Sequence, residues 1–111
     1  MDRTALKQML DGGYIDGYAF DMKANTFTMR VDVLDNDGLS SYNVRFEALS
    51  HFLFDSESRG IKERLELTEI WINETPEASA SEEWTVMISM WDMTHVTIRC
   101  TSIVVDDDLV R

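Results

Sequence analysis

The sequence predicts a mainly β fold, an antiparallel β-sandwich or a partly open barrel of about six strands with one short N-terminal helix. An α+β fold is the alternative. Apolar and polar side chains alternate along residues 26–34 and again along residues 39–47, and a period of two puts one set on each face of a strand. Asp35-Asn36-Asp37-Gly38 lies between the two runs and supplies residues that tolerate tight turns and positive φ. These observations predict an antiparallel hairpin.

Length and composition indicate a single domain, residues 1–111. A chain of 111 residues, of which 44% are hydrophobic, can bury a core and is not typical of a disordered protein. The one cysteine, Cys100, excludes an internal disulfide and suits a reducing compartment. Residues 1–7 lack the apolar stretch of a signal peptide, and no run of about 18 apolar residues occurs. We therefore expect a cytoplasmic protein.

The net charge of −11 arises from 21 acidic and 10 basic side chains. Such a surface repels phosphate backbones and anionic lipids, so we expect neither a nucleic acid nor a membrane as a partner. A basic protein would instead be attracted over a long range. Many bacterial cytoplasmic proteins are acidic for solubility alone, and this alternative stays open.

Residues 2–11 predict a short helix, because Leu6, Met9 and Leu10 form one apolar stripe at helical spacing. Gly12 and Gly13 follow and end the helix. The helix is too short to be stable alone, so we expect it to pack against the rest of the chain.

Residues 14–23 predict a strand whose inner face is aromatic. The inner set is Tyr14, Tyr18, Phe20 and Met22. Asp16 interrupts this face beside Gly17, which predicts either that pairing begins near Tyr18 or that a β-bulge intervenes. A turn at residues 23–26 would then complete a meander of three strands.

The pattern is less regular after residue 47. Residues 48–54 fit either one helical turn or a bend with apolar anchors, and residues 55–60 fit an exposed loop. Residues 61–66 either end that connection or begin the next strand, which we expect over residues 65–73. Proline, small residues and glutamates predict a solvated loop at residues 74–83.

A second hairpin is expected from residues 84–91 and 95–105, with its turn at residues 92–94 and a solvated tail at residues 106–111. We expect the inward faces of these strands to form the core of the domain. We expect the inner set to include Phe20, Phe27, Met29, Val31, Val33, Val44, Phe46, Val86, Ile88 and Ile98.

Two of the late strands carry apolar residues on both faces. Leu67 and Trp71 fall on the second face of one strand, and Met87 and Trp91 on the second face of another. We expect these four residues to form one apolar patch, a candidate interface. Either the N-terminal helix and residues 48–54 cover it, or a partner does, and a homodimer about a two-fold axis is one such arrangement.

The residues that carry chemistry form no recognisable catalytic or metal-binding pattern. With Gly38 at the sixth position of a calcium loop, valines fall at positions one and twelve, where neither can ligate. His51, His95 and Cys100 lack the clustered spacing of a zinc site. There is no glycine-rich phosphate loop and no serine elbow. We therefore expect no enzyme, no catalytic residues, no metal and no cofactor.

Three stretches carry a resemblance to known proteins. They are Tyr14-Ile15-Asp16-Gly17-Tyr18 after the short helix, Arg45-Phe46-Glu47-Ala48-Leu49 after the hairpin, and Ile98-Arg99-Cys100 in a late strand. This layout is similar to small uncharacterised bacterial β-rich proteins, some of which are immunity proteins that neutralise polymorphic toxins by direct binding. The resemblance implies a non-enzymatic acidic protein with a basic toxin as its partner. It assigns no functional residue.

Two other functions stay open from the residues themselves. A small-molecule-binding β-barrel would place Tyr14, Tyr18 and Trp84 around a cavity. A structural domain without a ligand is the other alternative.

Overall fold

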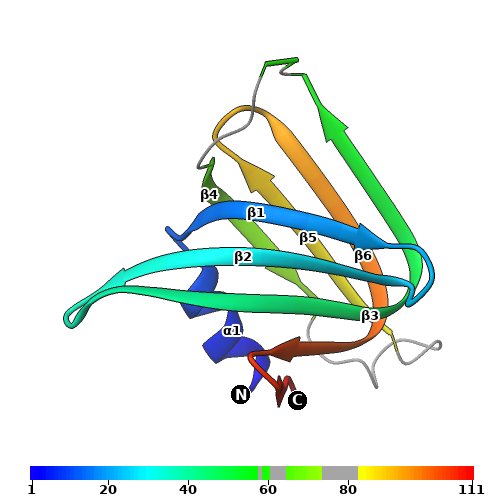
Figure 1. The fold of residues 1–111 in the computed structure, drawn as a ribbon, viewed down its shortest axis with the longest axis horizontal. Helices are drawn as coiled ribbons and strands as arrows, with labels where there is room; N and C mark the ends of the chain where they lie inside the picture. The colour runs from blue at the N-terminus through cyan, green and yellow to red at the C-terminus, as the bar shows by residue number, and fades with distance from the viewer. Residues whose placement is uncertain (58, 61–64, 74–82) are drawn as a thin grey trace.

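The computed structural model describes residues 1–57, 59–60, 65–73 and 83–111. Its elements, in chain order, are α1 (Arg3–Leu10), β1 (Tyr14–Asp21), β2 (Thr26–Asp35), β3 (Gly38–Ser56), β4 (Leu65–Ile72), β5 (Trp84–Met90), β6 (Thr94–Val105) and β7 (Asp108–Leu109). The strands pair antiparallel in the order β3-β2-β1-β4-β5-β6-β7, and β3 also pairs with β6 (Figure 1). The pairing of β3 with β6 curls the sheet back on itself, so the strands form a partial ring. The predicted mainly β fold with one short N-terminal helix is confirmed.

Strand β3 belongs to both halves of the ring. Its residues 38–47 pair with β2, and its residues 44–56 pair with β6. Ala48 has a φ of 53°, and the register with β6 shifts between Leu49 and His51, so a bulge bends the strand there. In Figure 1, β3 runs along β2 and then turns to follow β6. Of the two alternatives for residues 48–54, the bend forms, and it lies inside a continuous strand.

The structure differs from the loops that the sequence predicted after residue 54. Asp55 and Ser56 still belong to β3, so the predicted loop at residues 55–60 begins later than expected. The loop predicted at residues 74–83 lies outside the described residues except for Glu83, as does most of the connection at residues 61–66.

In the part of the chain that the structure describes, two residue pairs join the ring between β1 and β4, Tyr14 with Glu66 and Ile15 with Leu65. Of the two alternatives for β1, the bulge forms, because pairing begins at Tyr14 and the register shifts between Ile15 and Gly17. The bulge puts Ile15 in the core and Tyr14 on the outer side, so the prediction that Tyr14 faces inward is wrong.

The aromatic residues of β1 beyond the bulge lie opposite the buried residues of β2, as expected, but they are not buried. Tyr18 pairs with Met29 and Phe20 with Phe27, yet Phe20 is 51% exposed. Beyond Ile15, β1 has ladder partners only on the β2 side among the described residues. Phe20 lies there at the margin of the core, where its ring stacks on that of Phe52. The prediction that Phe20 belongs to the core is therefore wrong.

The core fills the space between the two layers of the ring. Leu6 and Leu10 of α1 enter it at one end and are fully buried. Val33 is half-buried. The other expected inner residues are all buried, namely Phe27, Met29, Val31, Val44, Phe46, Val86, Ile88 and Ile98.

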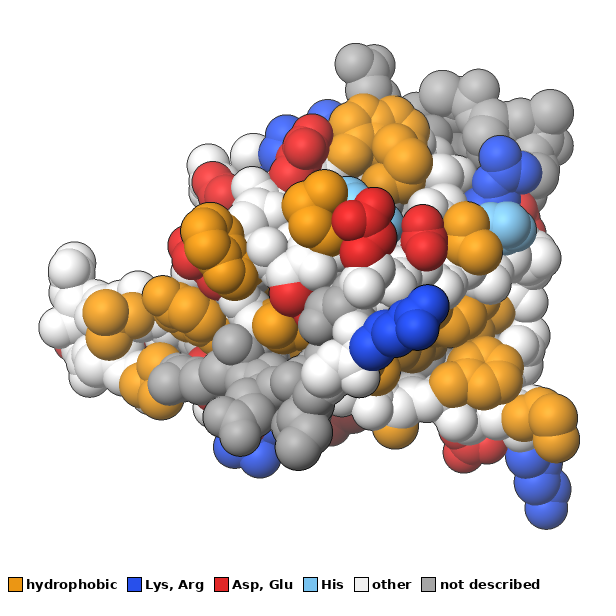
Figure 2. Space-filling model, turned by 90° about the horizontal axis from the view of Figure 1, so that it is seen from above, with side chains coloured by type: hydrophobic (Ala, Val, Ile, Leu, Met, Phe, Trp, Pro, Cys, Tyr) orange, Lys and Arg blue, Asp and Glu red, His pale blue; other side chains and the backbone are white. Residues whose placement is uncertain are grey.

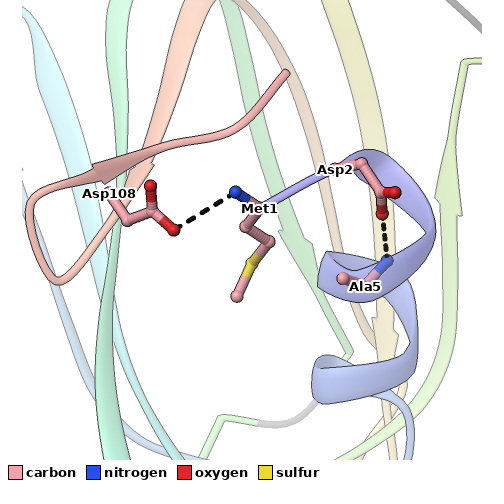
Figure 3. A network of polar contacts seen from close by, with 4 residues as sticks. All are labelled: Met1, Asp2, Ala5 and Asp108. Carbon is pink, nitrogen blue, oxygen red and sulfur yellow. Dashed lines mark hydrogen bonds and ion pairs between the residues drawn. The ribbon is translucent and has the colours of Figure 1, made fainter.

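The C-terminal residues are not the solvated tail that their aspartates suggested. Strand β7 pairs with β6, and the buried Val110 donates its N–H to the carbonyl of Ile103 at 2.8 Å. The carboxylate of Asp108 lies 3.2 Å from the Met1 ammonium group, while Asp2 caps α1 through the Ala5 N–H (Figure 3). The residues from Asp106 to Leu109 are exposed, as predicted, but they form a turn and a strand bonded to β6, so the prediction of a tail is wrong.

Gly13 links α1 to the sheet at a point that has no room for a side chain. A Cβ at Gly13 would lie 3.0 Å from Val31 Cγ1 and 3.2 Å from the carbonyl oxygen of Leu10. The carbonyl of Gly13 accepts the Leu67 N–H at 2.8 Å, so the backbone cannot move away without loss of this bond.

We therefore expect Gly13→Ala to lower the free energy of unfolding by about 1–3 kcal/mol, measured by urea denaturation. Gly17→Ala is the matched control, because no atom lies within 4 Å of the added methyl group. Its free energy of unfolding should equal or slightly exceed that of the wild type. Equal midpoints for the two variants would contradict the close packing at Gly13.

Candidate functional site

The outer face of β4, β5, β6 and the second half of β3 presents a group of exposed side chains. Val86, Ile88, Val96 and Ile98 point into the core, so the residues between them on β5 and β6 point outward. The β6 strand pairs with β5 on one side and with β3 on the other, and β4 pairs with β5. The four strands thus form one continuous outward face.

One row of residues crosses this face from strand to strand. Trp71 lies opposite Met87, Met87 opposite Thr97, and Thr97 opposite Leu53. Trp71 is 44%, Met87 45% and Leu53 53% exposed, and Thr97 is half-buried. We name these four residues the tryptophan row. With strands about 4.8 Å apart, the row is about 14 Å long.

The rows on either side of the tryptophan row are polar and differ in charge. Thr85, Arg99 and His51 lie opposite one another on one side, and we name them the arginine row. On the other side the same register gives the acidic row, which consists of Glu69, Ser89, His95 and Asp55.

Two open depressions flank the tryptophan row. One, of about 450 Å³, is bounded by the tryptophan and arginine rows, and the other, of about 180 Å³, by the tryptophan and acidic rows. Both are lined by Trp71, Met87 and Thr97. Figure 2 shows the two histidines at the surface, each beside hydrophobic and charged side chains.

The structure brings together only part of the predicted patch. Trp71 and Met87 are neighbours on the outer face, and Trp91 is exposed in the turn after β5. Leu67 is 2% exposed and lies in the core, so its assignment to the outer face is wrong. The register with β5 shifts between Leu67 and Glu69, and this bulge places Leu67 and Trp71 on opposite faces.

Of the two alternatives for the cover of this face, the one that used the N-terminal helix is wrong. The apolar residues of α1 are used in the core, where Leu6 and Leu10 are buried, and Trp71 and Met87 remain exposed. Leu53 was missed because no strand was expected at residues 48–54. The signal was present, since His51 and Leu53 alternate there with Phe52 and Phe54.

The acidic row holds the one arrangement on this face that resembles catalytic machinery. The Ser89 Oγ lies 2.9 Å from the His95 Nδ1, and Asp55 is the register partner of His95 on the other side. A nucleophile–base–carboxylate relay needs both ring nitrogens of the histidine engaged. No ion pair joins His95 to Asp55 among the described residues. As it stands, the arrangement is a hydrogen-bonded surface pair.

The residues expected around a small-molecule cavity do not come together. Tyr14 lies on the outer side of β1, Trp84 is buried in the core opposite Cys100, and the Tyr18 ring packs 5.4 Å from that of Phe54. The 220 Å³ depression that Tyr18 lines contains neither Tyr14 nor Trp84.

Cys100 is a buried thiol without a metal-binding neighbourhood. Burial raises its pKa to about 12, and the negative charges of Glu83 and Glu47 act in the same direction. Within the described ranges, no group of three or more His, Cys, Asp or Glu residues could hold a metal ion. The arrangement can therefore keep Cys100 protonated and inert at neutral pH.

Cys100 is accordingly expected to resist iodoacetamide in the native protein at about pH 8 and to react fully once urea unfolds it, as read by mass spectrometry. Leu34→Cys is the matched control, because its thiol would sit at an exposed position beside the β2–β3 turn, away from the tryptophan row, and be alkylated without denaturant. Alkylation of native wild type at the rate of the control would contradict the burial of Cys100.

Comparison with protein-family models and with curated proteins gives no match to this chain. In the part of the chain that the structure describes, no helix has the length and apolarity to cross a membrane. The fold and the face together define a small, mainly β domain with an exposed apolar row on one side of its sheet.

Proposed function

We propose that this protein is a non-enzymatic protein-binding domain and that its partner is a basic protein that binds on the tryptophan row. The tryptophan row itself carries the proposal. Tryptophan and methionine are enriched in the centres of interfaces. Exposed apolar side chains on three of the four strands, with the half-buried Thr97 between Met87 and Leu53, form a surface that a partner would shield from water.

The shape of the face favours a protein over a small molecule as the ligand. Small-molecule sites are concave and enclose most of the ligand, whereas the two depressions beside Trp71 and Met87 are open and lie on the outside of a sheet. A macromolecular surface can fill both depressions and contact the whole row at once.

The charges favour a basic partner. The three rows contain two carboxylates, those of Asp55 and Glu69, and one guanidinium group, that of Arg99; Glu66 is exposed elsewhere on β4. The net charge of −11 adds a long-range attraction that would raise the association rate of a basic protein. The tryptophan row would then supply the short-range contact.

The resemblance to immunity proteins gives the proposal its specific form. An immunity protein neutralises a toxin by binding alone and needs no catalytic group. An acidic protein with an acidic row on one side of the tryptophan row would serve that purpose against a basic toxin in the cytoplasm.

The decisive experiment uses the product of the gene adjacent to this one, co-expressed with wild type, Trp71→Glu or Leu34→Glu. Both variants add one carboxylate at an exposed apolar residue, and Leu34 lies beside the β2–β3 turn, away from the tryptophan row. We expect a basic product that binds wild type and Leu34→Glu equally and binds Trp71→Glu at least about 30-fold more weakly in calorimetry.

The salt dependence supplies a second criterion. Binding to a basic partner should weaken as the salt concentration rises, because the attraction between opposite charges is screened. A neighbouring product that does not bind, or that binds Trp71→Glu as well as wild type, would refute the proposal.

A further inference from the structure

We infer that a second copy of this chain covers the tryptophan row when no other partner is bound, in a symmetric dimer whose two-fold axis runs along the row. This inference rests on the proposed function in one respect, that the same face binds protein. It adds a defined occupant and a defined geometry.

The pattern of the face is self-complementary. An apolar row lies between a row that contains Arg99 and His51 and a row that contains Glu69 and Asp55. A two-fold axis along the central row places the apolar rows against each other. It also places the arginine row of each copy against the acidic row of the other.

Strand register then gives the individual pairs. Residues of the two flanking rows meet where they belong to the same strand, so His51 of β3 lies over Asp55 of the second copy. On β6, Arg99 lies over His95 of the second copy, next to the same Asp55. On β5, Thr85 lies over Ser89 of the second copy. Each pair occurs twice by symmetry.

The other symmetric arrangement, with the axis parallel to the strands, is disfavoured by charge. It reverses the strand order across the interface and keeps each row opposite itself. Glu69 would then lie over Asp55 of the second copy, two carboxylates face to face, and this would happen twice. Like charges opposed across an interface weaken association, so the axis along the tryptophan row is the one selected.

The effect of salt on binding distinguishes dimerisation from the binding of a basic partner on the same face. Two chains that each carry a net charge of −11 repel one another, and salt screens this repulsion. Dimerisation should therefore tighten as the salt concentration rises, whereas binding of a basic partner weakens. The two occupants also exclude each other, so the dimer would compete with the partner.

The first test is sedimentation equilibrium of the purified wild-type protein from micromolar to submillimolar concentrations, at low and at high salt. We expect a monomer–dimer equilibrium that shifts towards dimer in high salt. Trp71→Glu should raise the dimer dissociation constant at least about tenfold, and Leu34→Glu should leave it within about twofold. A monomer under all conditions would overturn the inference, and it would leave the proposed function intact because no partner is present.

The second test fixes the axis by thiol cross-linking with bismaleimidoethane, whose short spacer suits packed sheet faces about 10 Å apart. Leu53→Cys alone should give a covalent dimer, because each Leu53 lies over its own equivalent. Cys100 does not interfere, since it is buried and protonated.

The control for the axis is a mixture of Glu69→Cys with Asp55→Cys. These positions meet only when the axis is parallel to the strands, and their substitution removes the charges that oppose that arrangement. We expect no cross-linked product from the mixture. A product from the mixture without one from Leu53→Cys would overturn the proposed axis.

Discussion

The double pairing of β3 is the constraint on which the rest of the structure depends. Residues 44–47 are bonded to β2 on one side and to β6 on the other, so a single strand fastens the two layers together. Val44 and Phe46, at this junction, are fully buried. The bulge after Ala48 then carries the strand into the second layer, where Leu53 completes the tryptophan row. The candidate face therefore exists because β3 continues past the bend.

Sequence alternation predicted both the strands and their faces wherever it is unbroken. Strand β2 and strand β5 fall in this class, and their inward residues are those expected. A bulge inserts one residue and exchanges the faces without any change in the types of residue that follow. The sequence pattern therefore predicts that Leu67 and Trp71 share one face of β4, whereas the structure places them on opposite faces. Tyr14 was misplaced for the same reason at the bulge in β1.

The candidate site was harder to predict than the fold because it depends on which strands are neighbours. Met87 and Thr97 belong to one hairpin, and their pairing follows from its turn. Leu53 reaches the same row through a pairing between distant parts of the chain, for which local pattern gives no signal. The aspartates near the C-terminus show a second limit. They look like a solvated run, yet Asp106 accepts the Asn43 N–H and Asp108 meets the Met1 ammonium group.

The ladder between β3 and β6 also bears on how fast the protein folds. Val44 lies opposite Val105, and more than half of the chain lies between these two residues in the sequence. The chain must close this long loop before β3 of the first layer can pair with the end of β6. Domains dominated by such distant contacts fold in milliseconds to seconds, because loop-closure entropy is lost before the contacts form. The two hairpins can form early and locally, but the tryptophan row cannot exist until β3 and β6 have met. Folding and the formation of the tryptophan row should therefore occur in the same kinetic step.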